Sequence, residues 1–264
     1  MSNDLFIGID VGASSTKAAV LDRDEYLIGH AVLRSGTDFE GTAAASLAEA
    51  LAMAGMSGRD GFRCVSTGYG RKNVPFREDT KTEISCHAKG CYKEFPEAIT
   101  IIDIGGQDNK VIKLDVKGRR LNFKMNRKCA AGTGAFLEEM AMRLAVPLEE
   151  MDGLARSAEH MVELGSYCTV FSGTEVLEKI RQGVEAPDLV KGIFLSMIRR
   201  VLEMDSLSGR VVMTGGVVAH NPYLVDMVRD IIGHEVLVPE HPQLTGAIGA
   251  ALFAAAGEDQ PHSS

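Results

Sequence analysis

The chain has 264 residues, of which 45% are hydrophobic and 24% are charged, so it can form one large domain or two ordinary ones around a real core. A net charge of −8 and a pI of about 5.4 argue against a nucleic-acid partner, because such proteins carry a basic face. No apolar run approaches the roughly 20 residues of a membrane span, and the polar N-terminus does not resemble a signal peptide. We therefore expect a cytoplasmic protein with neither a nucleic-acid nor a membrane partner.

The sequence contains five cysteines, an odd number that does not suit a framework of disulfides. Structural disulfides are also rare in the reducing compartment expected for this chain. We therefore expect thiols that are buried, reactive or bound to a metal.

Two segments of the sequence are similar to each other, one at residues 6–22 and one at residues 101–115. Each has an apolar strand rich in β-branched residues, a turn with aspartate and glycine, and a second apolar strand, which together predict a hairpin. One constant spacing indicates an internal duplication. Five identical pairs lie 93 positions apart: Asp10 and Asp103, Gly12 and Gly105, Lys17 and Lys110, Leu21 and Leu114, and Asp22 and Asp115.

The turns of these hairpins have the chemistry of a phosphate-binding loop. Their glycines permit a positive φ and let backbone N–H groups approach a ligand closely, and successive N–H groups can form a concave site for phosphate. Asp10 and Asp103 each end a strand, where a carboxylate can hold Mg²⁺ through water. A single hairpin of this kind could equally be an ordinary hairpin with a glycine turn. Two copies at a fixed spacing favour the interpretation as phosphate loops. Lys17 and Lys110 are candidates for phosphate contacts or for surface lysines at the hairpin ends.

Three cysteines lie in segments that predict burial. Cys64 belongs to a short apolar strand and is expected in the core. Cys86 and Cys91 lie in a predicted helix over residues 83–92. Their C-x₄-C spacing is compatible with a metal site, but we interpret the segment as a helix with one buried cysteine on each of two faces.

The other two cysteines have a different setting. Cys129 opens a glycine-rich run before a predicted helix over residues 135–144, and Cys168 lies shortly before a helix that runs through Ile180. A helix N-terminus carries about half a positive charge and unpaired N–H groups, which stabilise a thiolate or an anionic metal–sulfur cluster. Two thiolates per chain cannot complete a tetrathiolate site, but two chains about a two-fold axis can, for an iron–sulfur cluster or for zinc. The alternative is two buried small apolar side chains.

The last third of the chain contains another glycine pair, Gly215 and Gly216, at the end of an apolar strand. The small residues of the final predicted helix permit tight helix packing. In chain order we predict a strand at residues 210–214, a helix at residues 222–232 with Asn221 as its N-cap, a strand at residues 236–238, a helix at residues 244–256 and a disordered tail at residues 257–264.

The repeated strand, Asp-Gly turn and strand, followed by a strand that ends in Gly-Gly, resembles the actin/Hsp70/sugar-kinase superfamily. This resemblance implies an α/β fold of two duplicated subdomains with the nucleotide cleft between them. We expect the first subdomain at residues 1–97 and the second at residues 98–256, with the last helix packed back onto the first. The two turns would hold the β- and γ-phosphates, and Asp10 and Asp103 are the expected catalytic residues that position Mg²⁺ or water.

Some segments resemble one family within this superfamily more closely. The BadF/BadG/BcrA/BcrD ATPase family, which includes the ATPase activators of 2-hydroxyacyl-CoA dehydratases and related subunits of benzoyl-CoA reductase, is similar from about Phe6 to Ala254. The cysteine-glycine segment is absent from ordinary sugar kinases. The segments that carry the resemblance are residues 126–138 around Cys129, residues 102–108, residues 168–171, residues 83–88 and residues 213–217.

The family resemblance implies a homodimer with one four-iron–four-sulfur cluster between the subunits, held by Cys129 and Cys168 of each. An electron from ferredoxin or flavodoxin would pass to a 2-hydroxyacyl-CoA dehydratase, driven by ATP. Alternatives are an ATPase subunit of a benzoyl-CoA reductase-type complex, a small-molecule kinase of the same fold, or a nucleotide-dependent regulatory protein. The expected contacts to ATP or ADP with Mg²⁺ are Gly12, Ala13, Ser14, Ser15, Thr16, Lys17, Gly105, Gly106, Gln107, Gly215, Gly216 and Gln243.

Overall fold

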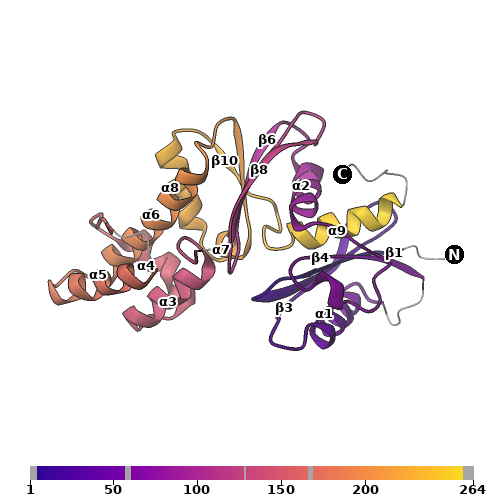
Figure 1. Cartoon of the computed structure of the whole chain (residues 1–264), viewed down its shortest axis with the longest axis horizontal. Coiled ribbons are helices and arrows are strands. Elements are labelled where there is room, and N and C mark those ends of the chain that lie inside the picture. Colours follow the sequence, from indigo (N-terminus) through magenta and orange to yellow (C-terminus); the bar gives the residue numbers. More distant parts are fainter. Residues whose placement is uncertain (1–4, 57–60, 128, 166–168, 258–264) are drawn as a thin grey trace. The chain divides into compact units, whose positions relative to one another are not determined.

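The computed structural model describes residues 5–56, 61–127, 129–165 and 169–257 of the chain. The chain divides into two compact units, which we call unit 1 (residues 1–97 and 244–264) and unit 2 (residues 98–243). Each unit is built around a five-stranded sheet with helices (Figure 1). Within the described ranges, no helix combines the length and the apolar character needed to cross a membrane. The predicted tail lies outside the described residues from residue 258 onward.

Unit 1 has a mixed sheet with the strand order β3-β2-β1-β4-β5. Its first three strands form an antiparallel meander, and β4 and β5 extend the sheet in parallel orientation. Its elements are β1 (Leu5–Val11), β2 (Ser15–Leu21), β3 (Leu27–Arg34), α1 (Phe39–Met53), β4 (Phe62–Thr67), η1 (Arg71–Asn73), β5 (Asp79–Thr80), α2 (Glu83–Glu94) and α9 (Thr245–Ala256).

Unit 2 repeats this sheet with the order β10-β9-β6-β7-β8. The meander is again antiparallel, and β9 and β10 are again parallel additions. Its elements are β6 (Ile99–Ile104), β7 (Asn109–Leu114), β8 (Arg120–Asn126), α3 (Gly134–Leu144), η2 (Leu148–Glu150), α4 (Met151–Ser157), α5 (Thr169–Arg181), α6 (Ala186–Met204), β9 (Arg210–Thr214), α7 (Gly216–His220), α8 (Pro222–Ile232) and β10 (Val236–Leu237).

The meanders of the two sheets agree residue by residue. In each copy the aspartate pairs in register with the lysine of the opposite strand, Asp10 with Lys17 and Asp103 with Lys110. Each sheet also has one register shift between its second and third strands, and the two shifts are again 93 residues apart, at Val20/Leu21 and Lys113/Leu114. The predicted duplication of an α/β fold is therefore confirmed, and it extends to all five strands of each sheet.

Glycines allow α9 to pack tightly within unit 1. A Cβ at Gly8 of β1 would overlap the backbone of Ala247 in α9, and a Cβ at Gly249 of α9 would overlap the backbone of Cys86 in α2. Helix α9 therefore lies directly on the sheet and on α2, while α1 covers the opposite face of the same sheet (Figure 1). The predicted second subdomain, residues 98–256, includes this helix with the expectation that it packs back onto the first subdomain, and in the structure the helix belongs to unit 1.

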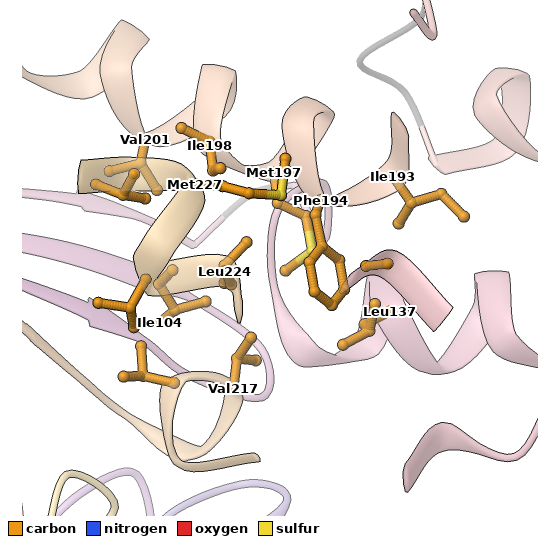
Figure 2. Close-up of a cluster of buried hydrophobic side chains, with 14 of the residues drawn as sticks. Ile104, Leu137, Ile193, Phe194, Met197, Ile198, Val201, Val217, Leu224 and Met227 are labelled. Carbon is orange, nitrogen blue, oxygen red and sulfur yellow. The ribbon is translucent and has the colours of Figure 1, made fainter. Parts of the chain in front are cut away.

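The core of unit 2 lies between its sheet and the helices α3 to α8. Helix α6 contributes the centre of this core with Phe194, Met197 and Ile198, each at most 1% exposed. Figure 2 shows these side chains with Leu137 of α3 and Leu224 of α8. The helices that follow the cysteine-glycine segment are therefore anchored to the sheet that carries the second Asp-Gly turn.

Candidate functional site

Each Asp-Gly turn contains a buried aspartate that pairs with the lysine of the opposite strand. Asp10 is 3% exposed, and its Oδ2 lies 3.3 Å from Lys17 Nζ. Asp103 is 2% exposed, and its Oδ2 lies 2.9 Å from Lys110 Nζ, which also lies 2.6 Å from Asp108 Oδ1. Lys110 is itself 1% exposed, so the interpretation as a surface lysine is wrong for this residue.

A glycine at the end of the neighbouring parallel strand leaves room for each carboxylate. Gly68 follows β4 with a φ of +87°, and Gly215 follows β9 with a φ of +103°. A Cβ at Gly68 would lie 2.5 Å from Asp10 Oδ1, and a Cβ at Gly215 would lie 2.9 Å from Asp103 Oδ1. Any larger residue at these two positions would therefore displace the aspartate and would also strain the backbone.

The two turns are closed in the same way. The N–H of Gly12 donates to Ser15 O at 3.1 Å, and the N–H of Gly105 donates to Asp108 O at 2.9 Å. We call residues 12–15 loop 1 and residues 105–108 loop 2. The predicted phosphate contacts in and beside these loops differ in exposure: Ala13, Ser14 and Gln107 are exposed, Gly12, Ser15, Lys17, Gly105 and Gly106 are half-buried, and Thr16 is buried.

Asp10 provides a test of whether the site fits a cation. Its Oδ1 is buried and accepts no hydrogen bond from the part of the chain that the structure describes. Leaving a buried acceptor unsatisfied costs about 1–3 kcal/mol, which a Mg²⁺ ion or one of its waters would offset. A buried carboxylate oxygen is a ligand that Mg²⁺ prefers, so Asp10 fits the predicted role.

The structure also brings together the predicted contacts at the end of β9. The N–H of Gly215 donates to Pro242 O at 2.9 Å, which draws the segment before α9 against this strand end. Gln243 Nε2 lies 3.3 Å from the position that a Cβ on Gly216 would take. Gly215, Gly216 and Gln243 therefore form one local group within unit 2, although 27 positions separate Gly216 from Gln243 in the sequence.

The segment from Cys129 to Ala135, which we call the cysteine segment, joins β8 to α3. Cys129 is half-buried, and its carbonyl accepts a hydrogen bond from Asn126 Nδ2 at 3.0 Å. Helix α3 begins at Gly134, and its first N–H groups donate to the carbonyls of Gly105 and Gly106 at 2.9 and 2.8 Å. Loop 2 therefore uses two of the N–H groups at the start of α3, and the stabilisation of a thiolate by this helix N-terminus stays a prediction.

Three of the remaining cysteines are buried, as the sequence predicts. Cys64, Cys86 and Cys91 are fully buried. Burial raises the pKa of the Cys64 thiol and of the Cys86 thiol to about 12, so both stay protonated at neutral pH and are poor metal ligands. Cys168 lies outside the described residues, and α5 begins at the next residue, Thr169.

Comparison with known proteins decides the family. Residues 7–254 match the BadF/BadG/BcrA/BcrD ATPase family. The chain belongs to this family. It is 44% identical over 251 residues to the activator of lactoyl-CoA dehydratase of Anaerotignum propionicum, which covers 94% of this chain and 96% of that protein. The predicted family is therefore confirmed, and the chain is an ATPase of the BadF/BadG/BcrA/BcrD type.

Two solved structures of the same family have this fold. The (R)-2-hydroxyglutaryl-CoA dehydratase component A of Acidaminococcus fermentans matches with a TM-score of 0.90 at 36% identity, over 96% of this chain and 98% of that one. The activator of the 2-hydroxyisocaproyl-CoA dehydratase of Clostridium difficile, with bound ADPNP, matches with a TM-score of 0.89 at 38% identity, over 98% of this chain and 100% of that one. The predicted fold class is confirmed by both.

Proposed function

We propose that this chain is an ATP-dependent activator of a 2-hydroxyacyl-CoA dehydratase. The observation that carries the proposal is its likeness, over nearly the full length of both chains, to proteins described as activators of such enzymes. These relatives favour the activator over a benzoyl-CoA reductase subunit or a small-molecule kinase. ATP hydrolysis and activation of a partner enzyme are therefore the two activities to measure first.

In this proposal loop 1 and loop 2 are the phosphate-binding loops for ATP, and Gly215, Gly216 and Gln243 contact the adenosine. The bound Mg²⁺ would neutralise phosphate charge. Asp10 and Asp103 hold the metal or its waters, and their lysine partners hold each carboxylate in one orientation. The exposed Ala13, Ser14 and Gln107 present backbone donors at the loop tips.

The finer part of the proposal concerns electrons. A homodimer would hold one four-iron–four-sulfur cluster through Cys129 and Cys168 of each subunit, and the cluster would carry one electron at a time from ferredoxin or flavodoxin to the dehydratase. Among the described cysteines, Cys129 is the one that is not fully buried, as a ligand shared between two chains requires. The high pKa of Cys64 and of Cys86 removes two competitors.

Iron analysis of anaerobically prepared protein tests this part. We expect about two iron atoms per chain, the half-share of a four-iron cluster that bridges a dimer. Cys129→Ser should lose nearly all iron and all dehydratase activation while ATP binding persists, because the phosphate loops are separate elements. Cys91→Ala is the matched control and should keep its iron. Iron that follows Cys91, or one tightly bound zinc per dimer without iron, would rule out the proposed electron transfer.

A further inference from the structure

The carbonyl groups of loop 2 hold the first turn of α3. The N–H of Gly134 donates to Gly105 O, and the N–H of Ala135 donates to Gly106 O. A trans peptide group is planar, so its N–H points opposite to its C=O. The N–H groups of Gly106 and Gln107 belong to these same two peptide groups and therefore point away from α3. One side of the two peptides holds the helix, and the other side presents two donors that suit a phosphate.

Asn109 makes a second connection from the same hairpin to the cysteine segment. It is the first residue of β7, it is 1% exposed, and its Nδ2 donates to Gly132 O at 2.9 Å. Gly132 has a φ of +82°, and a Cβ there would lie 3.2 Å from Asn109 Nδ2 and 3.2 Å from Arg200 Cβ. The segment is thus seated closely between Asn109 and Arg200, and it cannot shift without breaking the amide's hydrogen bond.

The first copy of the hairpin uses the same positions differently. Thr16 is the counterpart of Asn109, and its hydroxyl lies 2.9 Å from Ser35 Oγ. Ser35 in turn donates to Gly12 O at 2.6 Å, and Gly12 is the counterpart of Gly105. The carbonyl that accepts from a serine side chain in unit 1 therefore accepts from a helix in unit 2. Loop 1 is held through Ser35, whereas the carbonyls of loop 2 accept directly from the backbone of a helix.

We propose that Asn109 is a positioning residue that joins loop 2 and the cysteine segment into one hydrogen-bonded body, so that the accessibility of Cys129 depends on which phosphates are bound at loop 2. A terminal phosphate fixes the peptide planes of residues 105–107, their carbonyls fix the start of α3, and Asn109 fixes Gly132. The inference rests on the proposed nucleotide site. It requires no particular metal at Cys129.

The test measures alkylation of Cys129 in the full-length chain carrying Cys168→Ala. Cys64, Cys86 and Cys91 are fully buried and react slowly with a maleimide. The rate constant for Cys129 is measured with MgADP and with MgADPNP, and calorimetry measures the binding of each nucleotide. We expect the two rate constants to differ by about three- to tenfold, the effect of one rearranged hydrogen bond.

The decisive variant is Asn109→Asp, which keeps the size of the side chain and removes its amide donor. The ratio of the two rate constants should fall to about one, while the affinity for MgADPNP stays within about threefold. Asn122→Asp makes the same chemical change on the exposed part of β8 and should keep the parental ratio. A full ratio in Asn109→Asp with nucleotide bound would overturn the role of Asn109.

The labelling and calorimetry of the chain that keeps Asn109 distinguish a failure of this inference from a failure of the proposed function. Binding of both nucleotides with equal labelling rates would overturn the inference and leave the nucleotide site intact. Binding of neither nucleotide would remove the proposed site, and the inference with it. Hydrogen exchange of the Gly134 and Ala135 amides is a second readout that needs no substitution at Asn109. Exchange should be slower with MgADPNP than with MgADP, and equal protection would overturn the inference.

Discussion

Replacing Lys110 by methionine should destabilise unit 2 far more than Lys17→Met destabilises unit 1. Lys110 is 1% exposed and lies 2.9 Å and 2.6 Å from two carboxylates, of which Asp103 is 2% exposed. Removing one member of a buried ion pair leaves an uncompensated buried charge and costs about 3–5 kcal/mol. The lysine of the first copy is 15% exposed and lies 3.3 Å from its partner, so its loss should cost about 1–2 kcal/mol.

The assay is urea unfolding followed by hydrogen exchange of peptides from each unit, because a chain with two units need not unfold in one step. Lys110→Met should lower the free energy of unfolding reported by the strands β6 and β7, and it should leave β1 and β2 nearly unchanged. The double variant Lys110→Met with Asp103→Asn should recover part of the loss, since it also removes the buried charge. Equal losses for Lys110→Met and Lys17→Met would refute the energetic difference between the two copies.

Three further predictions follow from the site and the packing. Asp10→Ala and Asp103→Ala should each abolish ATP hydrolysis while the oligomeric state persists in size-exclusion chromatography, because each removes a proposed Mg²⁺ or water ligand; hydrolysis at the parental rate would exclude both from the site. Gly249→Ala should destabilise unit 1 by at least about 1–3 kcal/mol, since a Cβ there overlaps the backbone of α2, and an unchanged urea midpoint would contradict this packing. Burial raises the pKa of Asp205, but its hydrogen bonds and the charge of Lys113 outweigh burial and hold that pKa below its ordinary value. The stability from this group is present above the unfolded pKa of about 4 and is lost as the pH falls through the lower folded pKa, so Asp205→Asn should flatten the acid side of a thermal-stability profile, and an identical profile would refute this.

The constant spacing of 93 residues predicts the two hairpins because nothing has been inserted within them. The last duplicated pair at this spacing, Asp22 and Asp115, has a structural role. Each accepts two backbone N–H groups in the turn that leads to the third strand, at corresponding positions in the two copies. The sequence contains these identities, but it does not show by itself that they mark the turn after the second strand.

Gly68 shows where a fixed spacing fails as a guide. It stands beside Asp10 as Gly215 stands beside Asp103, and both glycines follow a threonine at the end of a strand. The two Thr-Gly pairs are not 93 residues apart, because the connections that precede β4 and β9 have different lengths. Both pairs share the pattern apolar-x-Thr-Gly, which residues 131–134 also match, so the pattern does not by itself identify the two glycines beside the aspartates.

The destination of the α3 donors could not be predicted from the local sequence. A glycine-rich run before a helix has the same local pattern whether its N–H groups serve a thiolate, an anion or a carbonyl. The structure shows that Gly105 and Gly106 accept them, which depends on where the start of α3 lies relative to loop 2. The assignment of Cys129 and Cys168 as ligands remains a prediction, since Cys168 lies outside the described residues.

The unequal connections between the third and fourth strands of the two sheets have an evolutionary consequence. In unit 1, α1 is the described helix of this connection, whereas in unit 2 the connection contains Cys129 and the helices α3 to α6. A doubled ancestor with two plain halves would already have possessed both hairpins in register. An insertion at a single place in the gene, between β8 and β9, would then have been enough to add Cys129 and the helices α3 to α6 to a nucleotide-binding protein. Relatives that lack this extension are therefore expected to keep the paired hairpins and to differ chiefly between β8 and β9.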